Sequence, residues 1–178
     1  MSQKKILRYF LEILSINQLK NINSEKEKLY VKKERILNHN LSKFLYREVG
    51  RDYSWTDRLS WTDQEWENLV SSTNYQLFTL YYNFDLAGYY EIIFDEDKNF
   101  EIAYLGIFKQ YFGKKIGSFL LSSAIKNSFN QGAKRVWVHT CTLDHPNALK
   151  NYLARGMKIF KHEEINLIKG KIANILKI

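Results

Sequence analysis

Residues 101–118, EIAYLGIFKQYFGKKIGS, carry the clearest chemical pattern in this chain. A strand-like run of apolar and β-branched residues leads into a short basic segment, then to Gly113, and then to a helical pattern. Such a turn directs free backbone N–H groups at a helix start toward a bound anion. Three lysines add positive charge at the same place: Lys109, Lys114 and Lys115. The sequence therefore predicts a phosphate-bearing ligand at this turn.

Two carboxylates, Glu91 and Glu101, fall within otherwise apolar strand patterns, where an uncompensated charge is unfavourable and often marks an acid or a base. If residue 94 pairs with residue 99 across the hairpin, the two carboxylates point to opposite faces of the sheet. A one-residue slip or a bulge places them side by side. The pattern leaves both arrangements open, and either residue could instead be a solvated strand residue.

His139 alternates with Val138 and Thr140 on a further strand pattern, beside Cys141. This histidine could line a substrate site or hold a base, although a lone histidine on such a strand more often has a structural role. Cys141 is not expected to be a nucleophile, because no partner base is spaced to activate it. The sequence shows no cluster of Cys and His residues of the kind that indicates a metal site.

The elements that must position these residues follow from hydrophobic periodicity and from turn residues. Helices are predicted over 6–16, 41–49, 115–131 and 145–155, and a capping-box pattern begins another at Thr62. Strands are predicted over 28–36, 75–82, 86–94, 99–108, 135–141 and 157–164. The β-branched and aromatic content of 6–16 leaves a strand possible there, and the tail 165–178 fits either structure.

This order of elements predicts an α/β fold, a mixed sheet with helices on its faces. A ligand at the turn after residue 108 would lie at the carboxyl end of a central strand, where open α/β sheets place their ligands. The chain has 178 residues, of which 45% are hydrophobic and 26% charged, as in an ordinary globular protein. We expect a single domain over 1–178, because the chain shows no repeat and no linker.

The charge is concentrated near the start of the sequence. Residues 1–43 hold ten Lys/Arg and four Asp/Glu, so +6 of the formal net charge of +8 lies there. A basic end could contact nucleic acid or an anionic surface, but no recognition motif accompanies it. Solvated faces are the simpler interpretation, and we expect no nucleic-acid partner.

The sequence also indicates the cellular compartment in which the protein is expected. A single cysteine, Cys141, excludes an internal disulfide and fits a reducing environment. Residues 1–16 superficially resemble a signal peptide, but Arg8 and Glu12 interrupt the apolar run and no small-residue cleavage site follows. Because no apolar stretch is long enough to span a bilayer, we expect a cytoplasmic protein without a membrane partner.

Two separated motifs in the right order resemble the GNAT N-acetyltransferase superfamily, from about Leu86 to Glu163. The pyrophosphate motif of that family, Gln/Arg-x-x-Gly-x-Gly/Ala, is similar to residues 110–115 here. Lys115 stands at its last position, where the family usually has a small residue that lets the backbone approach the pyrophosphate. Four residues match a second family motif: Asn147, Ala148, Tyr152 and Gly156. The segments WTDR (55–58) and VWVHTCTLDHP (136–146) resemble a narrower bacterial subgroup, and with them the resemblance covers nearly the whole chain.

The resemblance implies a mostly antiparallel central sheet with splayed strands flanked by helices, and acetyl-CoA (coenzyme A) as the acetyl donor. It implies that the following residues bind the cofactor: Leu105, Gly106, Ile107, Gln110, Tyr111, Phe112, Gly113, Lys114, Lys115, Ile116, Gly117, Ser118, Asn147 and Tyr152. A glycine inside a strand, as at 106, indicates a bulge or a close backbone approach. Tyr152 matches the family's general acid for the leaving thiolate. The base is Glu101, Glu91 or a water relay.

The acceptor side is expected near the aromatic segment 53–66, which in this fold lies between the first two helices. Its aromatic side chains could wall a pocket, with Asp57 binding a cation and Arg58 a carboxylate; equally, they could form an anchoring cluster braced by an Asp–Arg pair. We expect substrate contacts from Trp55, Asp57, Arg58, Tyr89 and His139. The acceptor itself is expected to be the primary amine of a small molecule or a peptide.

Three functions fit these observations. The first is an N-acetyltransferase that works by direct attack of the amine on the thioester. The second is a catalytically inactive acyl-CoA-binding sensor, and the third is a basic protein that binds nucleic acid without a cofactor. A homodimer is plausible, because strands and the apolar tail could pair with a second copy.

Overall fold

The computed structural model describes residues 5–22, 29–36, 38–53, 55–168 and 171–172. Its strands are β1 (Lys5–Ile13), β2 (Leu29–Lys33), β3 (Tyr75–Tyr82), β4 (Asp85–Phe94), β5 (Asn99–Ile107), β6 (Arg135–Cys141), β7 (Lys158–Ile168) and β8 (Lys171–Ile172). Its α-helices are α1 (His39–Gly50), α2 (Asp63–Val70), α3 (Ile116–Asn130) and α4 (Ala148–Ala154). Two short 3-10 helices, η1 (Ile16–Gln18) and η2 (Lys109–Tyr111), complete the chain order.

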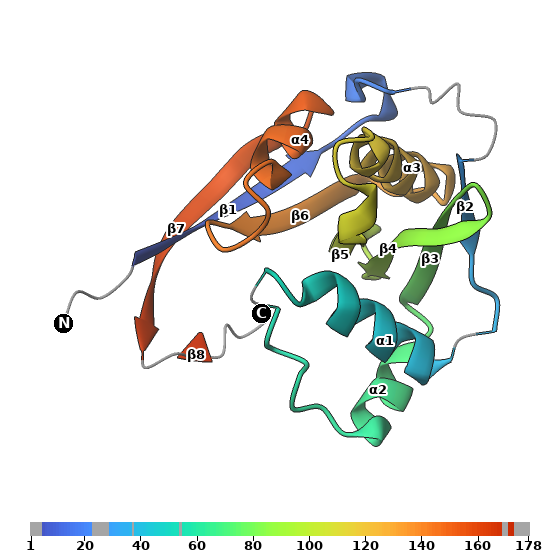
Figure 1. Ribbon diagram of the computed structural model, residues 1–178. Coiled ribbons are helices and arrows are strands. Elements are labelled where there is room, and N and C mark those ends of the chain that lie inside the picture. The colour runs from blue at the N-terminus through green and yellow to red at the C-terminus, as the bar shows by residue number, and fades with distance from the viewer. Residues whose placement is uncertain (1–4, 23–28, 37, 54, 169–170, 173–178) are drawn as a thin grey trace.

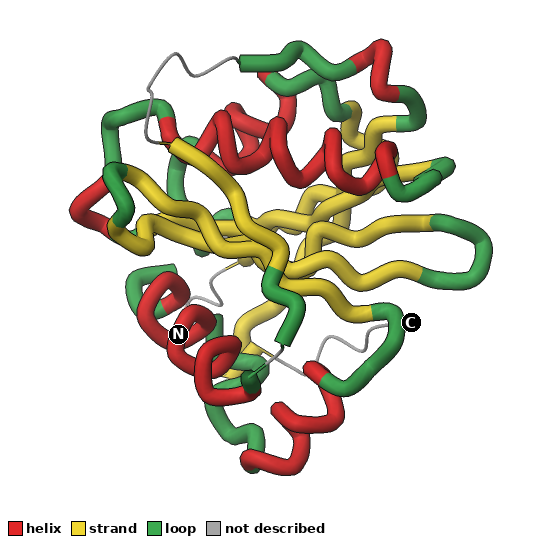
Figure 2. Tube along the Cα trace, turned by 90° about the vertical axis from the view of Figure 1, so that its right-hand side faces the viewer, coloured by secondary structure: helices red, strands yellow, loops and turns green. Residues whose placement is uncertain are grey.

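The strands form one mixed sheet in the order β2-β3-β4-β5-β6-β1-β7-β8. Neighbouring strands are antiparallel except β5 and β6, which run parallel. Figure 2 shows this sheet as a central layer with helices above and below it. The expected mixed α/β sheet flanked by helices is therefore confirmed.

Each face of the sheet has its own helices (Figure 1). Helix α3 packs on β4, β5 and β6, and α4 packs on α3 and β6. The core on this face joins Leu120 and Ile125 of α3 to Ile92, Ile102 and Val138 of the sheet. Helices α1 and α2 pack on β3, β4 and β5 from the opposite face. There they bury a second core: Leu45, Val49, Val70, Tyr75, Leu77 and Tyr89.

Strand β1 corrects the helix favoured for residues 6–16. It pairs with β6 on one side and with β7 on the other, both antiparallel. Leu11 and Ile13 of β1 are 0% and 1% exposed and belong to the core under α3 and α4. Strands β6 and β7 together supply hydrogen-bond partners for both edges of the β1 backbone. This pairing outweighs the helical spacing of its apolar residues.

Most of the remaining elements follow the expected boundaries, but α4 begins at Ala148 rather than 145, after its N-cap Asn147, and β2 ends at Lys33 rather than 36. Strands β3 and β6 match the predicted ranges, and α2 begins with a capping box between Thr62 and Glu65, as its sequence indicated. Helix α1 begins at His39, two residues before the predicted start at 41, because Asn38 is its N-cap. In the tail, β7 extends to Ile168 and β8 follows, while 169–170 and 173–178 lie outside the described residues.

The hairpin of β4 and β5 settles the orientation of the two strand carboxylates. Phe94 pairs with Phe100, one residue away from the simplest register, and the register shifts again between Glu91 and Ile92. Glu101 is therefore opposite Ile93, and Glu91 is opposite Tyr104. Because side chains alternate along β4, both carboxylates lie on the face that α1 and α2 cover.

Candidate active site

The candidate site begins at a fork between β5 and β6. The two parallel strands pair only over Asn99–Glu101 and Arg135–Trp137, whereas β5 continues to Ile107 and β6 to Cys141. Beyond the paired residues, the edge of β5 that faces β6 has no ladder partner in the described part of the chain. Leu105, Gly106 and Ile107 lie on this open edge, so their backbone can hydrogen-bond a ligand that enters between the strands.

Gly106 is required by its neighbours on the sheet face. A Cβ atom at this position would lie 2.3 Å from Cγ1 of Val49 and 3.5 Å from the Trp55 ring. Helix α1 and the segment after it therefore pack directly on the backbone of β5. The close approach indicated by a glycine within this strand is present, and it involves side chains of the same chain.

The turn after the fork leads into α3 through two residues with positive φ. Gly113 has φ +77°, and Lys115, the N-cap of α3, has φ +60°. Lys115 makes no side-chain capping bond, so the first N–H groups of the 15-residue helix are not capped by it. These orphan donors and the helix dipole favour an anion at this end of α3.

The backbone at residue 115 explains why a small residue suits this position. A left-handed conformation is unstrained for glycine and costs roughly 1–2 kcal/mol for other L-residues. Lys115 adopts it with an exposed side chain.

The side chains around the turn have different surroundings. Lys114 places its Nζ 5.1 Å and 5.4 Å from the ring centroids of Tyr82 and Tyr111. Lys109 forms an exposed ion pair with Asp52 at 3.3 Å. Gln110 is exposed, and Tyr111 is buried. The turn thus carries positive charge next to the uncapped helix start.

Helix α4 lies against the start of α3 and carries Tyr152. Ser118 donates to Oδ1 of Asn151 at 2.8 Å, and Nδ2 of Asn151 donates to the Gly117 carbonyl at 3.3 Å. Tyr152 is 7% exposed and belongs to the core beside α3. Burial, assisted by the Asp144 carboxylate, raises the pKa of Tyr152 well above its ordinary value. The phenol is therefore protonated at neutral pH, as a general acid must be. Asn147, the N-cap of α4, makes no side-chain capping bond.

Glu101 and His139 meet where the fork opens. Glu101 lies opposite Trp137 in the last parallel pair, and His139 follows two residues later on the same face. Nε2 of His139 is 3.9 Å from Oε1 of Glu101, with the side chains 35% and 11% exposed. A carboxylate and an imidazole thus lie together at the apex of the fork.

Glu91 and Arg58 form a buried ion pair at 2.7 Å, with side chains 0% and 1% exposed. Four aromatic rings surround the guanidinium, with centroids 4.4 to 5.8 Å from Cζ: Tyr46, Trp61, Trp66 and Tyr104. Burial opposes the charge of Arg58, but the Glu91 carboxylate outweighs it, and the pKa of Arg58 is raised. Arg58 therefore binds a carboxylate, but one that belongs to this chain.

We expect Arg58→Met to lower the free energy of unfolding by about 3 kcal/mol, because it leaves the Glu91 carboxylate buried without its partner. The double variant Arg58→Met/Glu91→Leu should recover part of that loss, since it removes both charges. Urea denaturation of the three proteins measures both effects. A double variant no more stable than Arg58→Met would contradict this account of the pair.

Asp57 and Trp55 hold the segment between α1 and α2 onto the sheet. The exposed Asp57 accepts hydrogen bonds from the hydroxyls of Tyr46, at 2.9 Å, and of Tyr104. The Trp55 ring lies 4.8 Å from the Tyr104 ring, centroid to centroid, and 6.4 Å from that of Tyr89, which is fully buried. The aromatic cluster is thus braced by Arg58 and Glu91, and Asp57 is not the partner of Arg58.

Asp144 was not singled out by the sequence. Its Oδ2 accepts from the Thr140 hydroxyl at 2.6 Å and from the Cys141 backbone at 3.0 Å, and its Oδ1 accepts from Trp55 Nε1 at 3.4 Å. Asp144 thereby joins the loop after β6 to the segment after α1. Its place in the turn between β6 and α4, two residues before Pro146, is the local signal that could have indicated a carboxylate bound to nearby backbone, because aspartate in turns commonly accepts such hydrogen bonds.

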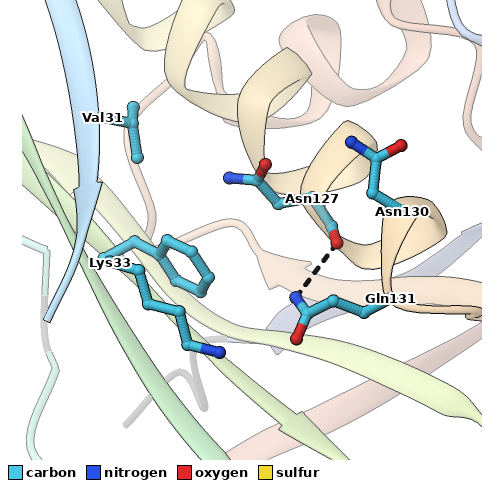
Figure 3. Close-up of a pocket in the computed structure, with 6 residues that line it drawn as sticks. Val31, Lys33, Asn127, Asn130 and Gln131 are labelled. Atoms are coloured by element: carbon cyan, nitrogen blue, oxygen red, sulfur yellow. Dashed lines mark hydrogen bonds between the residues drawn. The ribbon is translucent and has the colours of Figure 1, made fainter. Parts of the chain in front are cut away.

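A separate cleft of about 370 Å³ lies between β2, β3 and the end of α3 (Figure 3). Its lining residues are Val31, Lys33, Phe78, Asn127, Asn130 and Gln131, and Gln131 donates to the Asn127 carbonyl at 3.0 Å. These residues lie at the opposite end of α3 from Gly113. The cleft is therefore not part of the candidate site.

Two further findings apply to the described residues alone. They contain no group of three or more His, Cys, Asp or Glu side chains placed to hold a metal ion. None of the helices among them is both long enough and apolar enough to cross a membrane.

The site thus combines a fork between two parallel strands with the uncapped helix start that follows it. The model of the acetyltransferase (GNAT) family matches residues 36–157. The chain therefore belongs to the GNAT acetyltransferase family. A search of the curated proteins found no match.

Solved structures share this fold at low sequence identity. A GCN5-related N-acetyltransferase from Sphaerobacter thermophilus is 14% identical with a TM-score of 0.68, over 93% of this chain and 52% of that one. A functionally unknown conserved protein from Staphylococcus epidermidis is 18% identical with a TM-score of 0.64, over 90% and 60%. An aminoglycoside acetyltransferase from an uncultured soil metagenomic sample, in complex with sisomicin, is 18% identical with a TM-score of 0.54, over 71% and 85%. The chain thus spans little more than half the length of the first two structures.

Proposed function

We propose that this protein transfers the acetyl group of acetyl-CoA to a primary amine of a small molecule or a peptide by direct attack. The observation that carries the proposal is the open edge of β5 beside the uncapped start of α3. The open edge fits the amides of an extended pantetheine arm, and the helix start fits a diphosphate. Acetyl-CoA, when bound, supplies an activated acyl group.

The backbone of Leu105, Gly106 and Ile107 holds the pantetheine arm and orients the thioester carbonyl. The turn from Gln110 to Ser118, with Lys114 and Lys115, holds the diphosphate. Asn147 lies beside this cofactor path at the start of α4. These groups bind and position the donor so that its carbonyl carbon faces the apex of the fork.

Glu101, with His139 beside it, removes a proton from the incoming ammonium group, directly or through a water. The free amine then attacks the carbonyl carbon, the new C–N bond forms and the C–S bond breaks. Tyr152 gives its proton to the departing sulfur, and the second proton that the nitrogen loses on becoming an amide returns to Tyr152 through water. The products are the amide and free coenzyme A, with the first proton released from Glu101 to solvent. Glu91 is engaged by Arg58, so in this proposal it supports the acceptor wall and Glu101 is the base.

The test titrates the protein with acetyl-CoA by calorimetry and then measures thiol release with a panel of primary amines. We expect saturable binding and amine-dependent release of coenzyme A. Binding without release on any amine would instead identify an acyl-CoA sensor. Absence of binding would overturn the proposal, and salt-sensitive binding of DNA or RNA in its place would favour a nucleic-acid-binding protein.

A further inference from the structure

Arg8 lies on the acceptor side of the fork, although no role was expected of it. It pairs with Cys141 of β6 on one side and with Glu163 of β7 on the other. Phe10, two residues after Arg8 in β1, pairs with His139, two residues before Cys141 in β6. Since directly paired residues and residues two apart share one face, Arg8 shares the face of His139. It lies farther toward the open end of the fork, because β6 leaves β5 after Trp137.

The guanidinium of Arg8 is buried with few partners. The residue is 9% exposed, and its Nε is buried without a hydrogen-bond partner among the residues that the structure describes. Within the described chain its ion pair is a contact of 3.5 Å between Nη1 and Glu163 Oε1. Glu163 also contacts Lys161 at 3.4 Å and is one-third exposed. By comparison, Nη1 of the buried Arg58 lies 2.7 Å from Oε2 of Glu91, whose side chain is fully buried.

A buried donor without a hydrogen-bond partner is unfavourable, because it has lost its bond to water and gained none in return. The planar guanidinium fork matches a carboxylate through two parallel N–H···O bonds, and Nε is one of the donors that such a bidentate contact uses. A ligand carboxylate at Arg8 would accept a hydrogen bond from Nε and replace the long contact between Arg8 and Glu163. Glu163 would still form its ion pair with Lys161. The surroundings of Arg8 therefore favour the binding of an additional carboxylate.

We propose that the acceptor is a small amino acid, whose amine is directed to Glu101 and His139 while its carboxylate is bound by Arg8. This inference rests on the proposed acetyl transfer. Two residues along a strand span about 7 Å, so the amine and the carboxylate are held within one compact molecule rather than at the two ends of a long peptide.

The experiment compares small amino acids with their amides, so that each pair differs in the carboxylate alone, at equal concentrations of unprotonated amine. The protein should use the acids with a kcat/KM about 10- to 100-fold higher than the amides, since hydrogen bonds to charged groups contribute that much. Arg8→Gln should remove this preference by lowering kcat/KM for the acids, and leave kcat/KM for the amides and the Kd of acetyl-CoA unchanged. Arg8→Lys, which keeps the charge but not the fork, should be intermediate.

Arg135→Gln is the matched control, because Arg135 lies on the same face and is bound by Glu12 at 2.6 Å. It should keep the preference for acids. Thermal melting shows whether each variant is folded, and binding of an amino acid to the CoA-bound protein by calorimetry gives a second readout. Equal use of acids and amides, or equal losses for both in Arg8→Gln, would overturn this inference alone. Failure of every amine to release thiol would overturn the acetyl transfer as well.

Discussion

Gly113→Glu is expected to abolish measurable binding of coenzyme A, with a Kd at least ~100-fold higher, or about 2.7 kcal/mol. The new carboxylate would lie where the diphosphate is proposed to bind, next to the start of α3, and repel it. A Cβ at this position meets no atom within 4 Å, so the first atom of the new side chain has open space. Calorimetric titration of the variant with coenzyme A measures the loss.

Two controls separate charge from backbone strain. Gly113→Ala carries the same strain, since φ is +77°, but adds no charge, and it should bind coenzyme A with only a small loss. Gly132→Glu introduces the same carboxylate after the other end of α3, where φ is +86° and the space is also open. It should bind normally. Full affinity in Gly113→Glu would show that the phosphates bind elsewhere.

Tyr152→Phe is expected to lower kcat by about 10²- to 10⁴-fold, the range of general acid catalysis, and to leave the affinity for acetyl-CoA nearly unchanged. The ring still fills its buried position, so the loss comes from the missing proton donor. Steady-state thiol release gives kcat, and calorimetry gives the affinity. Tyr90→Phe is the matched control, because Tyr90 is also buried and its hydroxyl accepts from Asn127 at 2.7 Å on the same face of the sheet.

The pKa of Tyr152 fixes the sign of the pH dependence. An ordinary tyrosine loses its proton at pH ~10, and the raised pKa holds the acid form to still higher pH. Activity should therefore rise with pH as the amine loses its proton, without a decline caused by Tyr152 below pH ~10. Tyr152→Phe should show a profile of the same shape at a lower rate. Equal rates in the two proteins would remove Tyr152 from the acid role.

Local sequence was sufficient to predict most of the helices and strands around the site. Strands β3 and β6 are bounded by turn residues and have a clear strand composition, and the capping box of α2 is a short-range pattern. The turn at Gly113 was also apparent, because a strand, a glycine and a helix follow one another within a few residues. These features depend on neighbours in the chain, which a sequence displays directly.

Long-range pairing could not be derived in the same way. The 6–16 segment has helical spacing, and only its position between β6 and β7 makes it a strand. Arg58 and Asp57 are adjacent in sequence, yet Arg58 pairs with Glu91 while Asp57 binds tyrosine hydroxyls. The register of β4 and β5, which brings Glu91 and Glu101 to one face, depends on a shift that no turn residue specifies.

Strand β1 also determines the order in which this protein can assemble. Arg135 and Glu163 contact β1 residues that precede them by 123 and 155 positions. During translation, β1 therefore leaves the ribosome long before either neighbour exists, and its apolar side chains stay uncovered until β6 and β7 have been synthesised. Closing such long loops is slow and exposes intermediates to aggregation. Chaperone binding to nascent chains should consequently persist until β7 has emerged.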